Sequence, residues 1–192
     1  MTPLAEKTAY AIRWHGHGGQ GAVTSAKILA EAAFHSGFAG VTSQPSFGAE
    51  RRGAPITAST RLAHEPVRVL SQVTAPDIVV VLDDSLLGVA NATAGLAPGG
   101  AVIVNTNRSA GELGIGGDAH VVTSDVTGAA MAADLIVGGQ PMVSTAILGA
   151  FAAATGLITM ESVEAAIGHA FSGKAATKNI EAARIAFECT KA

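Results

Sequence analysis

The chain has 192 residues, of which 48% are hydrophobic and 14% charged, with a formal net charge of −3 at pH 7. This length suits one α/β domain with a substantial apolar core, and the charge excludes a general attraction to nucleic acid or to anionic membranes. Charged residues usually make up about 25% of a soluble domain. One interpretation of the shortfall is a packed domain rich in small residues. The interpretation we favour is that partner subunits cover much of the surface, since charged residues are depleted at the core of interfaces.

Cys189 is the only cysteine of the sequence. A single thiol excludes an internal disulfide, a cysteine-rich zinc site and a cysteine-ligated iron–sulfur cluster. The first residues lack the pattern of a signal peptide, and no apolar run reaches the length of a membrane span. We therefore expect a soluble, cytoplasmic protein.

The N-terminal part of the sequence predicts a strand, a helix and two further strands. Residues 10–14 form a short apolar run, and the apolar residues of 20–36 recur at helical spacing up to Gly37. A second strand is predicted over 38–43, followed by a loop rich in proline and glycine. Residues 56–62 alternate between apolar and polar side chains, which indicates a half-exposed strand antiparallel to the others.

The middle of the sequence predicts the strands of a parallel sheet. Residues 66–70, PVRVL, are expected to pair with the strand before them. The β-branched runs within 77–84, 99–107 and 120–125 are typical of strands that are buried on both faces, as parallel strands are. A short helix is predicted within 85–94.

From Asp125 to the end the pattern is helical, with breaks at 138–141, 155–159 and 171–174. Strands that alternate with helices favour a parallel sheet. The sequence thus predicts an α/β fold with three layers: a mostly parallel sheet, flanking helices and a helical C-terminal third. We expect one domain over residues 1–192.

The stretch WHGHGGQG, residues 14–21, lies between the first predicted strand and the first predicted helix. Its Gly16, Gly18 and Gly21 match G-x-G-x-x-G, in which glycines allow a tight turn and let a phosphate approach the backbone at a helix start. A dinucleotide site also needs an acidic residue about 20 positions on, and the second strand ends in VTSQ without one. The motif favours another phosphate or polar ligand over NAD; the alternative is a loop that packs against another chain.

A second glycine motif does not predict a nucleotide site. Gly168, Gly173 and Lys174 match the start of the P-loop pattern, but Ala175 stands where serine or threonine would bind magnesium, and no strand precedes the motif. We expect Gly173 to end a helix.

His15 and His17 flank Gly16, but no third ligand follows at a recognisable spacing, so we predict no metal site. His17 is expected to donate a hydrogen bond to a ligand, and His15 to close the first strand. Asp83 and Asp84 follow a predicted strand and are interpreted as caps of the next helix rather than as catalytic carboxylates. No catalytic residue is predicted.

The segment FGAERRGAP contains Glu50, Arg51 and Arg52, and four of the seven arginines lie between 51 and 68. Paired arginines suit bidentate binding of phosphate or carboxylate, and Glu50 can neutralise only one of them. The loop is too apolar to be simply solvated. We expect it to contact a ligand or a neighbouring subunit.

Taken together, the segments GHGGQGAVTSAKILAEAA, SFGAERRGAP and PDIVVVLDDSLL resemble the gamma subunit, or gamma domain, of the 2-oxoacid:ferredoxin oxidoreductases. Pyruvate:ferredoxin oxidoreductase is the best known of these enzymes. Further on, STAILGAF and KNIEAA are similar to later helices of the family. The resemblance covers nearly the whole chain.

This resemblance implies a subunit of a multi-subunit enzyme that oxidatively decarboxylates a 2-oxoacid to an acyl-CoA. It implies alpha, beta and iron–sulfur (delta) type partners, which carry thiamine diphosphate, magnesium and iron–sulfur clusters and pass electrons to ferredoxin or another acceptor. The gamma chain itself would hold no cofactor, would be inactive in isolation, and would help to bind coenzyme A and to assemble the complex. The residues so placed beside CoA or a subunit junction are Gly16, His17, Gly18, Gly19, Gln20, Gly21, Glu50, Arg51 and Arg52.

Two alternatives remain open at this point. A relative acting on an aromatic 2-oxoacid such as phenylglyoxylate would have the same gamma-type sequence features, because other subunits would bind the 2-oxoacid side chain. A free-standing nucleotide-binding α/β module would use the same glycine loop without partners.

Overall fold

The computed structural model describes residues 6–45, 53–67 and 71–191. The predicted loop residues Glu50, Arg51 and Arg52 lie outside these ranges.

A six-stranded sheet in the order β2-β3-β1-β4-β5-β6 forms the centre of the molecule. The strands β1, β4, β5 and β6 run parallel to one another, and β3 is antiparallel to both of its neighbours. Their bounds are β1 Ala9–His17, β2 Gly40–Pro45, β3 Pro55–Ala63, β4 Ile78–Val81, β5 Ala101–Asn105 and β6 His120–Ser124. The predicted parallel sheet and the antiparallel strand within it are confirmed.

Burial explains the patterns of these strands. Every residue of β4 and of β5 is buried, which is why both read as continuous β-branched runs. Strand β3 alternates because one of its faces is only partly covered. Its partners among the described strands are β1 and β2, so Pro66 and Val67 do not pair with it as predicted. Pro66 and Val67 lie outside any strand, and 68–70 lie outside the described residues.

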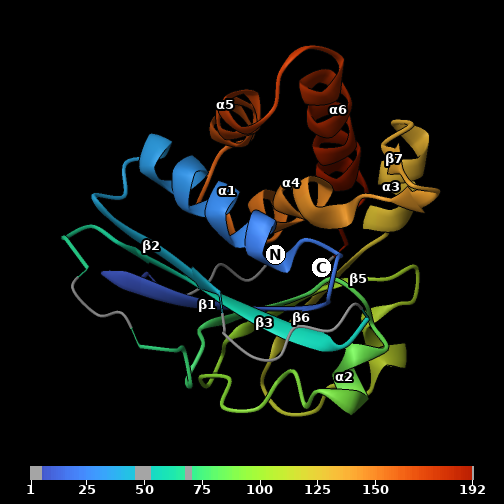
Figure 1. Ribbon diagram of the computed structural model, residues 1–192. Coiled ribbons are helices and arrows are strands. Elements are labelled where there is room, and N and C mark those ends of the chain that lie inside the picture. Colours follow the sequence, from blue (N-terminus) through green and yellow to red (C-terminus); the bar gives the residue numbers. More distant parts are fainter. Residues whose placement is uncertain (1–5, 46–52, 68–70, 192) are drawn as a thin grey trace.

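Most helices cover one face of the sheet (Figure 1). Helices α1 and α4 lie directly on the strands, and α5 and α6 pack outside them. The bounds of the helices on this face are α1 Ala22–His35, α3 Val126–Ala132, α4 Val143–Thr155, α5 Met160–Ala170 and α6 Gly173–Cys189. The opposite face carries the short helix α2, Leu86–Val89, and the 3₁₀ turn η1, Ala110–Leu113. The three-layer prediction is confirmed, although the second outer layer is thin.

Helix α4 lies at the centre of the larger core. Nearly all of its residues are buried, and Phe151 stacks on Trp14 of β1 with ring centroids 6.2 Å apart. The indole N–H of Trp14 donates to Thr60 Oγ1 at 3.0 Å, so this large side chain is fully buried without an unpaired donor. A smaller cluster between the other face and α2 is built from β4 and β5.

The C-terminal third is helical, as predicted, with one addition. A small hairpin of β7, Ile136–Val137, and β8, Gln140–Pro141, lies between α3 and α4. Gly138 and Gly139 form its turn, both with positive φ, which is the conformation that a two-residue hairpin requires. Gly173 begins α6 and does not end a helix as predicted, because α5 already stops at Ala170.

Lys191, the last described residue, pairs with the sheet. The backbone N–H and C=O of Lys191 both pair with Thr123 on the edge strand β6, at 2.9 Å each. The hydroxyl of Thr190 donates to Ala186 O at 2.6 Å and so continues the last turn of α6 into this contact. None of the helices in the described part of the chain has the length and apolar character that crossing a membrane requires.

Helices α4 and α6 approach each other so closely that their backbones touch at Gly149. A Cβ atom at this position would lie 1.8 Å from the carbonyl oxygen of Ala183, which is part of the helix backbone and cannot move aside. Glycine is therefore required here for packing, and its helical conformation is ordinary.

We expect Gly149→Ala to lower the free energy of unfolding by about 3 kcal/mol, at the upper end of the range for overpacking, since the added methyl forces the two helices apart. Gly168→Ala in α5 is the matched control: apart from the backbone of its own helix turn and its two chain neighbours, no described atom lies within 4 Å of its Cβ position. That variant should gain up to about 1 kcal/mol from helix propensity. Urea unfolding followed by circular dichroism measures both, and equal stabilities of the two variants would contradict the packing argument.

Candidate functional site

The glycine loop joins β1 to α1, and β1 extends further into it than the sequence predicted. His15, Gly16 and His17 pair with Thr57, Ile56 and Pro55 of β3. The strand thus ends at His17 instead of Trp14, because hydrogen bonds to β3 outweigh the weak strand preference of glycine. The turn itself is confined to residues 18–21.

Three glycines in this segment disfavour a side chain, each for a different structural reason. At Gly16 a Cβ atom would lie 3.0 Å from Leu82 Cδ1 and 3.2 Å from Ala22 Cβ, so a side chain would crowd the start of α1. Gly19 is exposed and has φ +99°, a conformation that the turn requires and other residues avoid. Gly21 has φ +87°, and its Cβ would lie 2.6 Å from that of Ser144 at the start of α4.

Gly18 and Gln20 fix the loop through hydrogen bonds to other parts of the chain. The Gly18 N–H donates to Ala54 O at 2.8 Å, and the Gly53 N–H donates to Gly18 O at 3.2 Å. Gln20 Oε1 accepts from the His17 N–H at 2.8 Å, and Gln20 Nε2 donates to Asp83 Oδ2 at 3.0 Å. The loop is therefore fixed before any ligand arrives.

His17 makes its contacts within the chain. Its Nδ1 lies 2.9 Å from Gly53 O, which can only accept, so Nδ1 carries a proton. Its Nε2 lies 3.3 Å from Ser85 Oγ. In this arrangement the His17 ring ties the glycine loop to the segment after Glu50–Arg52 and to the start of α2.

The two aspartates after β4 differ in role. Asp83 Oδ1 accepts from the Ser85 N–H at 3.1 Å and so closes the turn before α2. The N-cap residue of this helix is Ser85 and no side chain caps it, so the prediction that Asp83 is a helix cap was wrong. Burial raises the pKa of Asp83, but the hydrogen bonds from Ser85 and Gln20 outweigh this and hold the pKa below its usual value. Asp84 instead accepts from Thr106 Oγ1 at 2.8 Å, so it links two strand ends and does not cap a helix.

A cavity of about 480 Å³ opens beside the glycine loop. It lies at the carboxyl ends of β1, β4 and β5 and at the start of α4. Its lining comprises Gly18, Gly19, Gln20, Gly53, Leu82, Asp83, Asn105, Thr127, Gln140, Pro141, Met142 and Val143. The chain leaves β1 toward the face that carries α1 and leaves β4 toward the face that carries α2. Ligands of open α/β sheets bind at such a switch point.

The helix starts around this cavity suit an anion. No side chain of the described residues caps α1 or α4, so the first N–H groups of both helices are left for a ligand or for water. Asn105, at the end of β5, donates to Leu82 O at 2.9 Å and accepts from the Thr127 N–H at 3.1 Å, which fixes α3 beside the cavity. Sequence reasoning missed Asn105 and Gln140. A polar residue directly after the buried run AVIV was the available signal for Asn105.

The residue that follows Glu50, Arg51 and Arg52 in the sequence is Gly53. Gly53 lines the cavity and pairs with Gly18. Gly53, the residue after Arg52 in the sequence, therefore lies against the glycine loop, and the joint role of the two segments stays a prediction.

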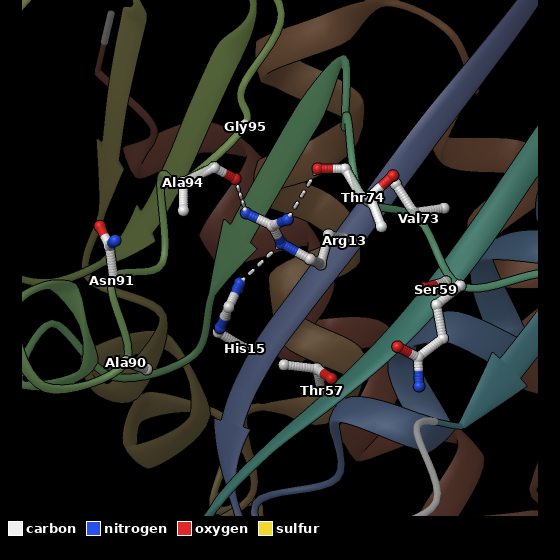
Figure 2. A pocket seen from close by; sticks show the side chains of 11 residues that line it. Arg13, His15, Thr57, Ser59, Val73, Thr74, Ala90, Asn91, Ala94 and Gly95 are labelled. Atoms are coloured by element: carbon white, nitrogen blue, oxygen red, sulfur yellow. Dashed lines mark hydrogen bonds between the residues drawn. The ribbon is translucent and has the colours of Figure 1, made fainter.

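A second cavity, of about 400 Å³, lies on the other face of the sheet (Figure 2). Arg13 extends across it and donates to His15 Nε2 at 3.0 Å and to backbone carbonyls of Thr74, Ala92 and Ala94. His15 is buried inside β1, so the prediction that it closes the strand was wrong. Arg13 is ionised and can only donate, so the proton of neutral His15 is on Nδ1, which has no partner among the described residues.

Burial in this position, together with the positive charge of Arg13, lowers the pKa of His15 from 6.5 to about 4. His15 is therefore neutral in the folded protein at physiological pH. Arg13 is held mostly by backbone carbonyls, so the pair connects β1 to the loops before β4 and after α2.

The fold and the first cavity define a class of protein: a doubly wound α/β domain that presents a glycine loop and uncapped helix starts at a switch point. The family model described as pyruvate ferredoxin/flavodoxin oxidoreductase matches residues 11–189. The chain belongs to this family, and its likeness to known gamma-type chains confirms the resemblance seen in the sequence.

The relatives agree over almost the full chain. The gamma subunit common to the pyruvate and ketoisovalerate oxidoreductases of Thermococcus litoralis is 51% identical over 182 residues, covering 93% of this chain and 96% of the relative. The pyruvate synthase subunit PorC of Methanothermobacter thermautotrophicus is 49% identical over 179 residues, covering 92% and 93%. The crystal structure of the pyruvate oxidoreductase subunit PORC from Thermotoga maritima has a TM-score of 0.82 at 33% identity, covering 96% and 98%. These likenesses favour a gamma subunit of a 2-oxoacid oxidoreductase over a free-standing nucleotide-binding module.

We expect His15 to make the protein sensitive to mild acid. Its folded pKa of about 4 lies below the unfolded value of 6.5. Between these two values the unfolded chain binds a proton that the folded chain does not. The contribution of His15 to stability is thus complete above pH 6.5 and falls as the pH drops toward 4, by about 3 kcal/mol in total.

In His15→Gln the amide oxygen accepts from Arg13 as the imidazole does, but the side chain does not titrate. The variant should lose less stability than the wild type when urea unfolding is compared at the two ends of this pH interval. Identical pH profiles of the two proteins would contradict the neutral, buried state of His15.

Proposed function

We propose that this chain is the non-catalytic gamma subunit of a complex that converts pyruvate, or a branched 2-oxoacid such as ketoisovalerate, to the corresponding acyl-CoA. The observation that carries the proposal is the 51% identity, over nearly the whole chain, to a gamma subunit named for both of these oxidoreductases. We propose that the chain acts as a single gamma-type unit over residues 1–192. Its cytoplasmic location stays a prediction.

The redox chemistry belongs to partner chains. Thiamine diphosphate, magnesium and iron–sulfur clusters on alpha, beta and delta type subunits would supply decarboxylation and electron transfer to ferredoxin or another acceptor. The single Cys189 cannot ligate a cluster alone. It is half-buried against Ser124 and α6, where its Sγ lies 3.5 Å from Ser124 Oγ.

We propose that the glycine-loop cavity holds part of coenzyme A. CoA carries a pyrophosphate, which requires positive ends of dipoles or cations around it. The uncapped starts of α1 and α4 supply N–H groups. Arg51 and Arg52 come directly before Gly53, which lines the cavity, and they would supply positive charge.

The described lining of the cavity is otherwise poor in charge. Asp83 is its only ionisable side chain among the described residues, and that carboxylate already accepts hydrogen bonds from Gln20 and Ser85. These hydrogen bonds keep Asp83 ionised, so the favourable charge for an anion would come from the helix starts and the arginines. In this arrangement the chain would bind and orient an anionic substrate and leave the proton and electron transfers to its partners.

Charge changes at Gln140 test the cavity directly, because this residue is exposed, lines the cavity and lies in the hairpin before α4. In the assembled complex, Gln140→Glu should raise the KM for CoA roughly fivefold and Gln140→Lys should lower it, since a screened charge contact at an exposed site is worth up to about 1 kcal/mol. The KM for the 2-oxoacid should stay constant. Ala165→Glu, an exposed position on α5, is the control with the same change in net charge.

Replacing Arg51 and Arg52 together by alanine should raise the KM for CoA about tenfold to hundredfold. One charge-assisted hydrogen bond contributes roughly 1.5–3 kcal/mol, and about 1.4 kcal/mol corresponds to a factor of ten. Size-exclusion chromatography must show that the variant complex is intact. An intact complex with wild-type CoA kinetics in both sets of variants would reject the CoA role; loss of the complex would assign the arginines to assembly.

We also expect the isolated chain to have no 2-oxoacid oxidoreductase activity. Purified alone, it should not reduce ferredoxin or a viologen dye in the presence of pyruvate, thiamine diphosphate, magnesium and CoA. Addition of the partner subunits should restore turnover. Reduction by the isolated chain at a rate near that of the complex would refute the non-catalytic role.

A further inference from the structure

We propose that Glu31, His35 and His169 form a zinc site that connects helices α1 and α5. The three residues lie at the end of α1 away from the glycine loop, since α1 begins at Ala22 and His35 is its last residue. The proposal is thus independent of the CoA cavity and of the oxidoreductase activity.

The geometry brings one donor atom from each residue into a single small cluster. Glu31 and His35 are four residues apart on α1 and so lie on one face of the helix. His169 reaches them from α5, with Nδ1 at 2.7 Å from Glu31 Oε1. The same oxygen lies 4.0 Å from His35 Nε2, and the two imidazole rings have centroids 5.4 Å apart. The donor atoms of all three residues lie within 4.8 Å of one another.

These separations are close to those of a tetrahedral zinc centre. Bonds of about 2.0–2.1 Å at tetrahedral angles put neighbouring ligand atoms roughly 3.3 Å apart. The Glu31–His169 pair would open by about half an ångström, and the other pairs would close by at most about 1.5 Å. The side chains are 33% to 62% exposed, so small rotations suffice and the core stays unchanged.

The donor set selects the metal. Two imidazoles and one carboxylate, with a fourth position open to water, are a typical ligand set of zinc. Magnesium and calcium prefer oxygen ligands throughout, so they should compete poorly. Nickel and copper also accept imidazole, and the exposed fourth position does not exclude them.

The ends of two helices add a favourable electrostatic term. His35 ends α1, and His169 is the residue before the last in α5. The carboxyl end of a helix carries a partial negative charge that attracts cations. Glu31 adds a full negative charge, whereas the nearest lysine in the sequence, Lys27, lies one turn earlier on α1. A divalent cation is thus better placed here than on an isolated histidine pair.

The competing explanation needs no metal. His169 and Glu31 also form an ion pair when the imidazole is protonated. His35 also lies at ion-pair distance from Glu31 without a metal, with its Nε2 4.0 Å from Glu31 Oε1, but that contact is long and needs a protonated ring. The dependence of metal binding on His35 therefore separates the two explanations.

The experiment uses the full chain, stripped of metal with a chelator. Isothermal titration with Zn²⁺ should show one high-affinity ion per chain, and Co²⁺ should give the visible absorption of a tetrahedral complex with nitrogen and oxygen ligands. His35→Ala, His169→Ala and Glu31→Gln should each weaken zinc binding by at least about tenfold, the effect of disturbing even the support of a metal ligand. His64→Gln removes another exposed imidazole and should leave the affinity unchanged.

A second measurement keeps the result interpretable if a variant proves unstable. Zinc binds only the folded protein in this scheme, so saturating Zn²⁺ should raise the melting temperature of the wild type. The shift should disappear in His169→Ala, whose exposed side chain can be removed without creating a cavity. Absence of a stoichiometric zinc ion in the wild type, or equal affinity in His35→Ala, would overturn the proposal. A loss of zinc binding in His169→Ala and Glu31→Gln but not in His35→Ala would remove His35 from the ligands and overturn the three-residue site.

Discussion

The structure depends on how closely helix α4 approaches its neighbours. Two glycines that leave no room for a side chain make this possible, one at the contact with α6 and one at the contact with α1. Gly149 brings α4 into backbone contact with Ala183 of α6, and Gly21 brings the start of α1 against Ser144 at the start of α4. Ser25 Oγ donates to Ser144 O at 2.7 Å and fixes the second contact. Dispersion contacts fall off steeply with distance, so this close packing stabilises the helical layer more than its small residues would suggest.

The same contact shapes the cavity beside the glycine loop. Because Gly21 is both the N-cap residue of α1 and its point of contact with α4, the two uncapped helix starts are held beside each other. Asn105 fixes the start of α3 next to them. The cavity wall is thus built from backbone held by the core, and a ligand would find its hydrogen-bond donors already ordered. Preorganised donors lower the entropy that binding must overcome.

The sequence contained most of the fold but only part of the site. Strands β4 and β5 were predictable because full burial leaves an unmistakable β-branched run, and β3 because its two faces differ. The C-terminal end of β1 was not predictable, because Gly16 and His17 belong to the strand only through their pairing with β3. The hydrogen bond between Gln20 and Asp83 could not be predicted from local sequence, because the parallel pairing of β1 and β4 brings the two residues together. The glycine pair at 138–139 was a hairpin signal that the helical pattern around it obscured.

Histidines were the least predictable residues. His15 and His17 are two positions apart, yet one is a buried neutral acceptor and the other bridges surface loops. Only Glu31 lies at a recognisable sequence spacing from His35, because His169 belongs to a helix far along the chain. The chemical role of an imidazole depends on its neighbours in the tertiary structure. Sequence spacing reveals such a neighbour only when both residues lie in the same helix or strand.

The pairing of Lys191 with Thr123 has a practical consequence for handling the protein. Strand β6 is the last strand on its side of the sheet, and a bare edge strand is a template on which other chains can assemble. The terminal residues occupy part of that template. Removal of the last few residues would therefore free hydrogen-bonding groups for sheet-to-sheet aggregation. An affinity tag fused at the C-terminus should be joined through a flexible spacer that leaves this pairing intact.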